Sequence, residues 1–404
     1  MQPPVVVLGV ARSSLGAIHG RWASTPPAHL LGQVIAELVG RSGLDPAALG
    51  GIVVGCTTPV GAQADNVGRQ AAVHAGLSEL SAITLDRHDA TPLAAVQVAA
   101  SLSAAHRRPF VAAAVDITSI VPPGAATVRD YGRPTLASLP DGLLAEREAQ
   151  RDGLRRAELQ AVATRSRSRA AASGDLERDL LTGRADVQRS PIRSDEVPPE
   201  PTDDLIEAMT GQFEADGIVS AATMASLADG AAAVLVMAVD DQPGSGPSRA
   251  ARTSAAARTR VVATVRAVVT AAADPDEPIA ALVAAARQAL DDAGRGIDEI
   301  DRLEIDERFA VFALGTARRL GVGPEVMNPD GGALALGSAP AVEGLRMMCA
   351  AVAGLGAAGG GTALLVCGGH GGQASAAVID VAGDVPRDRS SRPDEPESAE
   401  GPRH

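Results

Sequence analysis

The chain has 404 residues, a formal net charge of −13 and a hydrophobic content of 46%, which is enough for a large core and excludes an acidic disordered chain. Its acidic balance offers no electrostatic footprint for phosphates, and one Trp, one Tyr and four Phe cannot form a base-stacking platform. Nucleic acid is therefore excluded as a partner.

In the first third of the chain, short β-branched runs alternate with helical stretches rich in Ala and Leu. This alternation is typical of a layered α/β protein with buried strands. The expected strands are Val5–Val10, Gly51–Thr57, Ala82–Asp86 and Phe110–Ile117. The expected helices are His29–Arg41, Asn66–Leu77 and Ala90–His106.

The amino-acid composition changes from about Pro122 to Asp216, where arginines, acidic residues and prolines become more frequent and apolar runs typical of strands disappear. We expect an inserted polar domain here, with one or two exposed helices over Glu146–Ala172. The arginines of those helices either hold a phosphate-bearing ligand or form a solvated helix face. A strand-like run over Asp229–Val239 marks the return of the α/β pattern.

The last third repeats the order of the first. After a Pro/Gly/Ser-rich linker, the expected strands are Arg260–Thr270, Ile300–Ile305, Ala363–Cys367 and Ala374–Val381. The expected helices are Pro278–Gly294, Ala310–Leu320 and one that ends near Ala353. The predicted domains are an N-terminal half at 1–121 with 217–241, an insertion at 122–216, a C-terminal half at 249–383 and a disordered tail at 384–404.

The cysteine content and a search for common motifs predict which features this chain lacks. Three cysteines are too few for a disulfide framework and indicate a reducing cytoplasm. No basic leader precedes the first apolar run, and glycines interrupt the uncharged stretch 347–369, so we expect neither a signal peptide nor a membrane span. No phosphate-binding loop, dinucleotide fingerprint or metal-ligand cluster occurs, so we expect no metal site.

Five segments, in order and with compatible spacing, resemble the thiolases, enzymes that join or split acyl-CoA units. They are Val7–Gly16, Asn66–Ala72, Gly217–Ala232, Asp306–Ala310 and Asn328–Gly337. The resemblance spans about residues 5 to 382. It implies an α/β thiolase fold, in which two similar halves form a five-layered core with an inserted helical loop domain. Because the insertion is short, the resemblance implies a homodimer and no tetramer.

The same resemblance identifies the catalytic positions, and most of them have changed. Asp89 stands where thiolases have their nucleophilic cysteine, Ser338 where they have the activating histidine, and Asp306 where an asparagine positions a water. The second cysteine corresponds to Val366, or to Cys367 after a one-residue slip. A carboxylate is a weak nucleophile and a serine is no base at neutral pH, so the sequence predicts that the thiolase route of Claisen condensation is lost.

Each candidate residue has two interpretations. Asp89 is either the N-cap of the next helix or a base or charged anchor, and Ser338 is either an N-cap or a nucleophile or donor. His370 is either a replacement base or an exposed turn residue, and Cys367 is either a reactive thiol or a buried small hydrophobe. The backbone amides of Gly368 and Gly369 are expected to form an oxyanion hole.

The positions that contact pantetheine in thiolases also differ. Pro140–Gly142 replaces an H-M-G segment of the insertion, and Ala225 replaces a serine. Two functional hypotheses follow. The first is an enzyme that transfers or hydrolyses acyl groups, with no tightly bound cofactor and with CoA or a pantetheine thioester, free or on a carrier, as substrate. The second is an inactive paralogue that serves as a binding or scaffold subunit beside another thiolase-type or CoA-binding protein.

Overall fold

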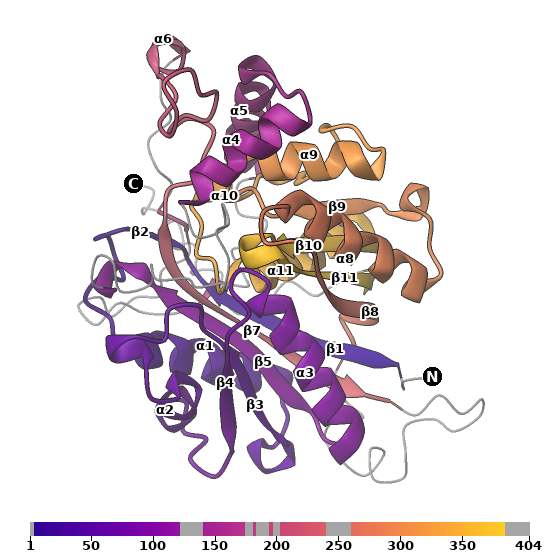
Figure 1. Ribbon diagram of the computed structural model, residues 1–404. Helices are drawn as coiled ribbons and strands as arrows, with labels where there is room; N and C mark the ends of the chain where they lie inside the picture. The colour runs from indigo at the N-terminus through magenta and orange to yellow at the C-terminus, as the bar shows by residue number, and fades with distance from the viewer. Residues whose placement is uncertain are drawn as a thin grey trace, which may run out of the picture.

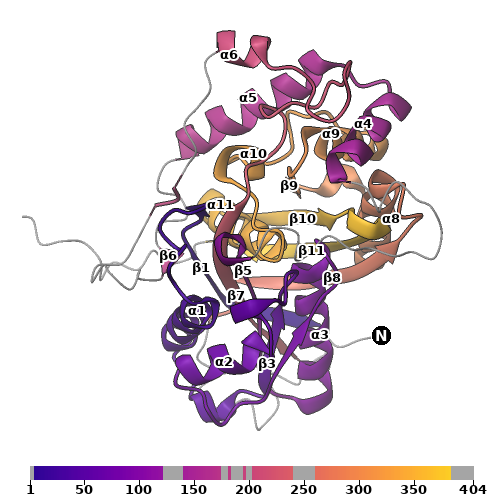
Figure 2. The same cartoon turned by 60° about the vertical axis from the view of Figure 1, so that its left-hand side comes forward.

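The computed structural model describes residues 4–121, 140–173, 181–182, 194–196, 203–239 and 260–383. The predicted tail at 384–404, the linker at 242–248 and much of the predicted insertion lie outside these ranges. The described parts contain two similar α/β units and a group of inserted helices (Figures 1 and 2).

The N-terminal half is built on five strands in the order β4-β3-β5-β7-β1. They are β1 (Val5–Ser13), β3 (Gly51–Gly55), β4 (Ala82–Leu85), β5 (Phe110–Ile117) and β7 (Ala228–Ala238). β3 runs parallel to β4 and β5, whereas β7 is antiparallel to β5 and β1. The short β2 (Gly16–Ala17) pairs with β7. All five predicted strands of this half are present.

The C-terminal half repeats this order with β9-β10-β11-β8. Its strands are β8 (Ala263–Ala272), β9 (Arg302–Ile305), β10 (Gly360–Gly368) and β11 (Gln373–Ala382). β9 runs parallel to β10, and β11 is antiparallel to both β10 and β8. Antiparallel pairing of β1 with β8 joins the two halves into one continuous sheet. Beyond β9, where the N-terminal half has β4, the described residues show an isolated parallel bridge between Leu303 and Met327 and no further strand.

In the described parts of the chain, helices form three layers around the two units. α1 (Pro27–Ser42) and α2 (Val67–His74) cover the outer face of the first, and α8 (Pro278–Ala293) and α9 (Ala310–Leu320) cover that of the second. α3 (Thr91–His106) and α11 (Glu343–Ala358) lie between them and contact strands of both halves. Three separate clusters of buried apolar residues correspond to the three helical layers. The predicted five-layered α/β arrangement is confirmed.

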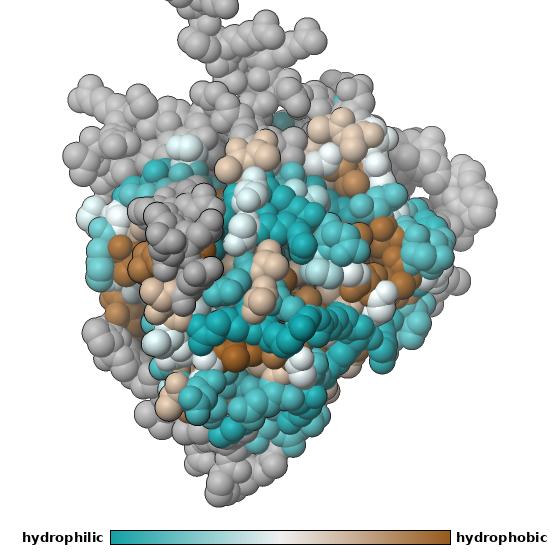
Figure 3. All heavy atoms as spheres, turned by 90° about the horizontal axis from the view of Figure 1, so that it is seen from above, coloured by the Kyte–Doolittle hydropathy of each residue, from teal (hydrophilic) through white to brown (hydrophobic). Residues whose placement is uncertain are grey.

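The described inserted elements are α4 (Asp141–Arg151), α5 (Arg156–Ser173), β6 (Leu181–Thr182) and α6 (Asp203–Ala208). α4 and α5 pack on α9 and α10 (Ala333–Leu336) at the top of Figures 1 and 2. Seen from above, this face is mainly hydrophilic, with separate hydrophobic patches (Figure 3).

Arginines of α5 hold the loops around it, so a solvated helix face does not describe them. Arg156 donates to the carbonyls of Met209 and Gly217, Arg167 to that of Ala222, and Arg169 to that of Met327. These hydrogen bonds to backbone carbonyls join α5 to the insertion, to the segment that leads into β7 and, through Arg169, to the C-terminal half.

The side chain of Asn328 makes hydrogen bonds to β9 that a neighbouring strand would otherwise make. Its Oδ1 accepts the Ile305 N–H at 2.8 Å, and its Nδ2 donates to the Ile305 carbonyl at 2.9 Å. Its backbone has a φ of +47°, in the left-handed region that Asn tolerates better than most residues. One amide side chain thus satisfies both backbone groups of a buried strand residue.

Replacing Asn328 by Ala should lower the free energy of unfolding by about 2 to 6 kcal/mol, because two buried backbone groups lose their partners at about 1–3 kcal/mol each. Urea unfolding measures this loss. Asn328→Gly is the matched control, since glycine relieves the positive φ but also lacks the amide. If the Gly variant is as stable as the wild type, the amide bonds carry no stability and the interpretation is wrong.

Candidate active site

Four ionisable side chains from four separate segments meet above the N-terminal end of α3. Asp89 precedes α3, Asp141 begins α4, Arg308 lies between β9 and α9, and His370 begins the turn after β10. Nη1 of Arg308 forms an ion pair with Oδ2 of Asp89 and lies 3.5 Å from Oδ2 of Asp141. Nδ1 of His370 lies 3.2 Å from that oxygen of Asp141 and 4.0 Å from Oδ2 of Asp89. We call these four residues the ion cluster.

The ion cluster is largely shielded from solvent. Asp89, Arg308 and His370 are only 6%, 8% and 7% exposed, whereas the side chain of Asp141 keeps 21%. Desolvation lowers the pKa of Arg308 to about 10, which still leaves it charged at neutral pH. A buried charge of this kind requires a paired opposite charge, and Asp89 supplies it.

Aromatic side chains surround the guanidinium of Arg308. Its Cζ lies 5.9 Å from the ring centre of Phe309 and 5.6 Å from that of Phe312. Phe309 also packs edge-on against Phe213 and Phe312. Three of the four phenylalanines in the chain therefore gather at this point. Such rings favour a cation over their faces, and they provide apolar surface beside it.

His88 extends the ion cluster on the side of α3. Its backbone is left-handed, with a φ of +51°, and its ring centre lies 4.7 Å from that of His370. The amide of His88 donates to Oδ1 of Asp86 at 2.7 Å, which closes the tight turn between β4 and α3. The strained turn brings two imidazoles together beside Asp89.

A second polar group lies behind Arg308, around Asp306. The Oδ1 of Asp306 accepts the backbone N–H of Arg308 at 2.9 Å, which fixes the turn that carries the arginine. Burial, together with the negative charge of Glu343, raises the pKa of Asp306 from an ordinary 3.8 to about 7. Glu343 is itself buried and accepts from Arg346 at 2.7 Å. Asp306 is therefore a partly protonated carboxyl at neutral pH.

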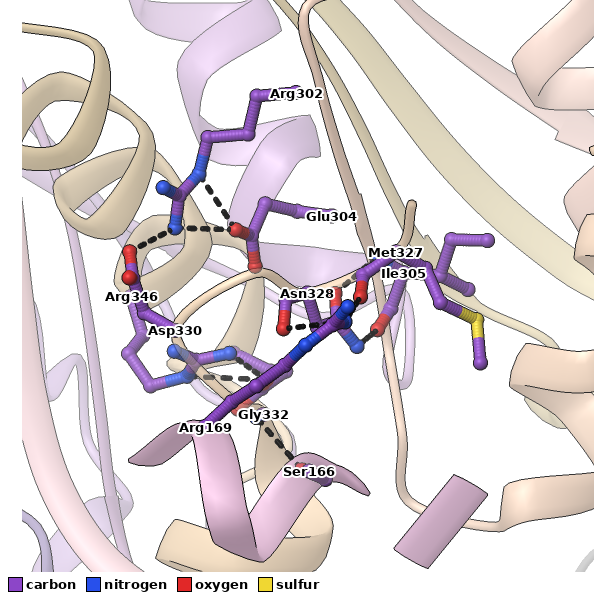
Figure 4. Close-up of polar contacts among 11 residues, drawn as sticks. Ser166, Arg169, Arg302, Glu304, Ile305, Met327, Asn328, Asp330, Gly332 and Arg346 are labelled. Carbon is purple, nitrogen blue, oxygen red and sulfur yellow. Dashed lines mark hydrogen bonds and ion pairs between the residues drawn. The ribbon is translucent and has the colours of Figure 1, made fainter. Parts of the chain in front are cut away.

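A network of polar contacts surrounds the end of β9, which leads into this turn (Figure 4). Arg302 bonds Glu304 at 2.8 Å and Asp330 at 2.6 Å, and burial raises the pKa of Glu304 to about 7. The Oγ of Ser166, in α5, accepts the Gly332 N–H at 2.9 Å, as Figure 4 shows, and donates to Glu307 at 2.5 Å. The inserted helix α5 is thus bonded to the same network as β9.

Comparison with known proteins agrees with this architecture. The family model "Thiolase, N-terminal domain" matches residues 5–240, and "Thiolase, C-terminal domain" matches residues 259–381. The chain belongs to the thiolase family.

Two similar relatives illustrate the match. An acetyl-CoA acetyltransferase of Pseudomonas aeruginosa is 31% identical over 369 residues, which cover 85% of this chain and 91% of the relative. A steroid 3-ketoacyl-CoA thiolase of Mycobacterium tuberculosis is 28% identical over 399 residues, which cover 93% of each chain.

The structure overturns the N-cap interpretations of Asp89 and Ser338. α3 begins at Thr91 after Ala90, with no side-chain cap, and the Asp89 carboxylate pairs with Arg308 instead. α11 begins only at Glu343, whereas Ser338 is bonded through its backbone to Ser226 and Ala228. Both predictions relied on local sequence. In the structure, contacts with distant segments determine the position of both residues, and neither side chain caps a helix.

His370 and Cys367 lie in different surroundings. The interpretation of His370 as an exposed turn residue is wrong, because the residue is buried in the ion cluster. Cys367 is buried in the layer between the sheets, whereas its neighbour Val366 packs on the opposite face. Burial and the charge of Asp306 raise the pKa of the Cys367 thiol well above its ordinary value, so it stays a neutral thiol.

The two glycines predicted to form an oxyanion hole differ in their bonding. The Gly369 amide donates to the Gln373 carbonyl at 2.7 Å, so that N–H is already used. Gly368 pairs with Ala374 at the end of the β10–β11 ladder, in the position next to this bonded pair. Because bonded and non-bonded pairs alternate along an antiparallel ladder, the Gly368 N–H is directed away from β11.

Sequence reasoning missed Arg308 and Asp141. Both lie inside segments that resemble thiolase motifs, at positions where N-E-A-F and H-M-G have an alanine and a methionine. The signal that would have found them is a charge in place of an apolar residue within a matched motif. Among the described residues, no group of three or more potential metal ligands occurs, and no helix is long and apolar enough to cross a membrane.

Asp306→Asn should make the free energy of unfolding less dependent on pH. Because the folded-state pKa is raised, the folded protein keeps a proton that the unfolded chain loses between about pH 4 and pH 7. Stability therefore falls as pH rises through this window, by about 1.4 kcal/mol per pH unit for one group. Urea unfolding from about pH 4 to about pH 8 measures the slope.

In the Asp306→Asn variant the free energy of unfolding should fall less steeply with pH. The part of the fall that comes from Glu304, whose pKa is also raised, should remain. Asp292→Asn, on the exposed side of α8, is the control and should leave the slope as it is. An unchanged slope in Asp306→Asn would show that the Asp306 carboxyl is ionised in the folded protein at acidic pH.

Proposed function

We propose that the chain handles acyl thioesters without forming a cysteine acyl-enzyme, by hydrolysis or transfer of the acyl group. The ion pair of Asp89 with Arg308 supports this proposal, because the thiolase resemblance assigns the nucleophile to position 89. A carboxylate paired with a guanidinium donates its electrons less readily, and Ser338 supplies no base. The thiolase step of acyl transfer to a thiolate therefore has no group to begin it.

His370 and Asp141 form an arrangement suited to hydrolysis. With the Nδ1 proton directed to Asp141 at 3.2 Å, the lone pair of the neutral imidazole is on Nε2. Nε2 takes a proton from water while the water oxygen attacks the thioester carbonyl carbon. The C–S bond then breaks, and the leaving thiolate takes that proton. The products are a carboxylic acid and a free thiol, and no bound cofactor is needed.

The substrate we propose is CoA or a pantetheine thioester, free or on a carrier. The relatives named above are an acetyl-CoA acetyltransferase and a 3-ketoacyl-CoA thiolase, which supports a CoA thioester as the ligand class. We also propose a cytoplasmic location, supported by the low cysteine content of three residues, which is too few for a disulfide framework.

The second candidate is an inactive paralogue that acts as a binding or scaffold subunit, beside another thiolase-type or CoA-binding protein. The contacts within the ion cluster favour it. The carboxylates of Asp89 and Asp141 both face the guanidinium of Arg308, so each already has a cationic neighbour within the protein.

A thiol-release assay with acetyl-CoA separates the two candidates. The wild type should release free CoA, and His370→Gln should lower kcat about 100-fold, the usual contribution of a general base. Asp141→Asn should act in the same direction, whereas the exposed His106→Gln is the control and should change nothing. Intact-mass measurement should show no acyl adduct.

Failure of the wild type to release thiol, with acetyl-CoA still bound, would support the scaffold subunit. A stable acyl adduct on Asp89 or Cys367 would contradict the proposed non-covalent route.

We further propose a homodimer formed through β4. This strand is at an edge of the sheet, its Ile83 is 46% exposed, and Val73 of the neighbouring α2 is 51% exposed. Apolar side chains on an edge strand favour pairing with another strand, and a second copy of the chain supplies one.

Sedimentation should give about twice the chain mass of 40.7 kDa for the wild type and the chain mass for Ile83→Lys. Val326→Lys, at a 48% exposed position of the C-terminal half, is the control and should remain dimeric. A monomeric wild type would contradict the dimer.

A further inference from the structure

We propose that Arg308 is the group that binds the thioester carbonyl oxygen, through its Nε–H, and that it selects acyl groups without a charge. This inference rests on the proposed function and specifies its substrate class. It assigns a direct role in binding to a residue that replaces an alanine of the family motif.

The observation behind it is a buried donor with nothing to bond. Nη1 of Arg308 is held by Asp89, with Asp141 close by. Among the residues that the structure describes, Nε of Arg308 has no hydrogen-bond acceptor, although the residue is 8% exposed. A buried N–H without an acceptor costs about 1–3 kcal/mol, so the position favours a ligand that brings an oxygen.

Charge decides what kind of oxygen fits. The positive charge of Arg308 already faces the carboxylates of Asp89 and Asp141. A ligand carboxylate would add a third negative charge in surroundings where charges are poorly solvated, and this costs free energy. A carbonyl oxygen adds no net charge and accepts from a single N–H, whereas a carboxylate is best bound by two parallel donors. The neutral carbonyl of a thioester meets both conditions.

The surroundings of the guanidinium suit an apolar acyl chain. Phe309 and Phe312 present rings to Arg308, and Phe213 packs against Phe309. These rings have no hydrogen-bond partner to offer a charged or strongly polar acyl terminus. Apolar acyl groups without a charge are therefore the class that we expect to bind.

The same donor becomes more important once the carbonyl reacts. Attack of water at the carbonyl carbon moves an electron pair onto the oxygen, and a charged donor stabilises the resulting oxyanion more than the neutral carbonyl. Arg308 then performs part of the task predicted for the Gly368 and Gly369 amides, of which that of Gly369 is already bonded to Gln373.

Calorimetric titration with four CoA ligands tests the proposal. Acetyl-CoA is compared with S-ethyl-CoA, a thioether of similar size that lacks the carbonyl oxygen. Pentanoyl-CoA is compared with glutaryl-CoA, which has the same chain length and a terminal carboxylate. The His370→Gln variant keeps the thioesters intact during titration where the wild type hydrolyses them.

In the His370→Gln variant, which retains Arg308, we expect acetyl-CoA to bind about 10-fold more tightly than S-ethyl-CoA, as one hydrogen bond from a charged donor would give. Pentanoyl-CoA should bind more tightly than glutaryl-CoA. In Arg308→Lys both preferences should largely disappear. Lysine keeps a positive charge for Asp89 but has no Nε–H in the guanidinium plane. Thermal unfolding confirms that this variant is folded.

Equal binding of acetyl-CoA and S-ethyl-CoA to the His370→Gln variant, in which Arg308 is present, would overturn the role of Arg308 while leaving CoA thioester binding intact. Tighter binding of glutaryl-CoA than of pentanoyl-CoA would overturn the selection for uncharged acyl groups. If none of the four ligands binds, the proposed handling of CoA thioesters fails, and the inference fails with it.

Discussion

A guanidinium that is buried among aromatic rings must have a carboxylate beside it, and the chemistry of this site follows from that requirement. Arg308 provides the guanidinium and Asp89 the carboxylate, from segments more than two hundred residues apart in the chain. Removing either partner would leave the other as an uncompensated buried charge. The two residues therefore depend on each other, and Asp89 stands at the position where the family resemblance puts a sulfur nucleophile.

Arginine is the only strongly basic residue in the chain, and the interior shows why this matters. Arg302, Arg308 and Arg346 are all buried, and each lies beside a carboxylate. A buried lysine loses its proton readily, whereas arginine stays charged and binds carboxylates with a planar fork of donors. Even so, buried carboxyls outnumber these cations around β9, and protonation of Asp306 and Glu304 near neutral pH reduces the excess negative charge.

The sequence alone was enough to predict the layers of the fold, but it was not enough to predict the ion cluster. The alternation of apolar runs placed β5 and β7, because a buried strand needs a continuous apolar run whatever lies beside it. The partner of Asp89 had no such local signature. An Asp before Thr91-Pro92 suits a helix start, but the carboxylate turns to a cation that only the tertiary fold brings near. His370 was named from its glycine-rich turn, whereas its contact with Asp141 depends on how the insertion packs.

The origin of the four residues of the ion cluster has a consequence for how the chain folds. Asp89 belongs to the first half, Arg308 and His370 to the second, and Asp141 to the insertion. Until these three parts have come together, each charge is solvated and costs nothing. The desolvation cost therefore falls on the last step of assembly, and it is offset only when the parts meet in the correct alignment. A misaligned intermediate would bury charges without partners. The ion cluster therefore destabilises incorrect packing of the two halves and the insertion relative to the native packing.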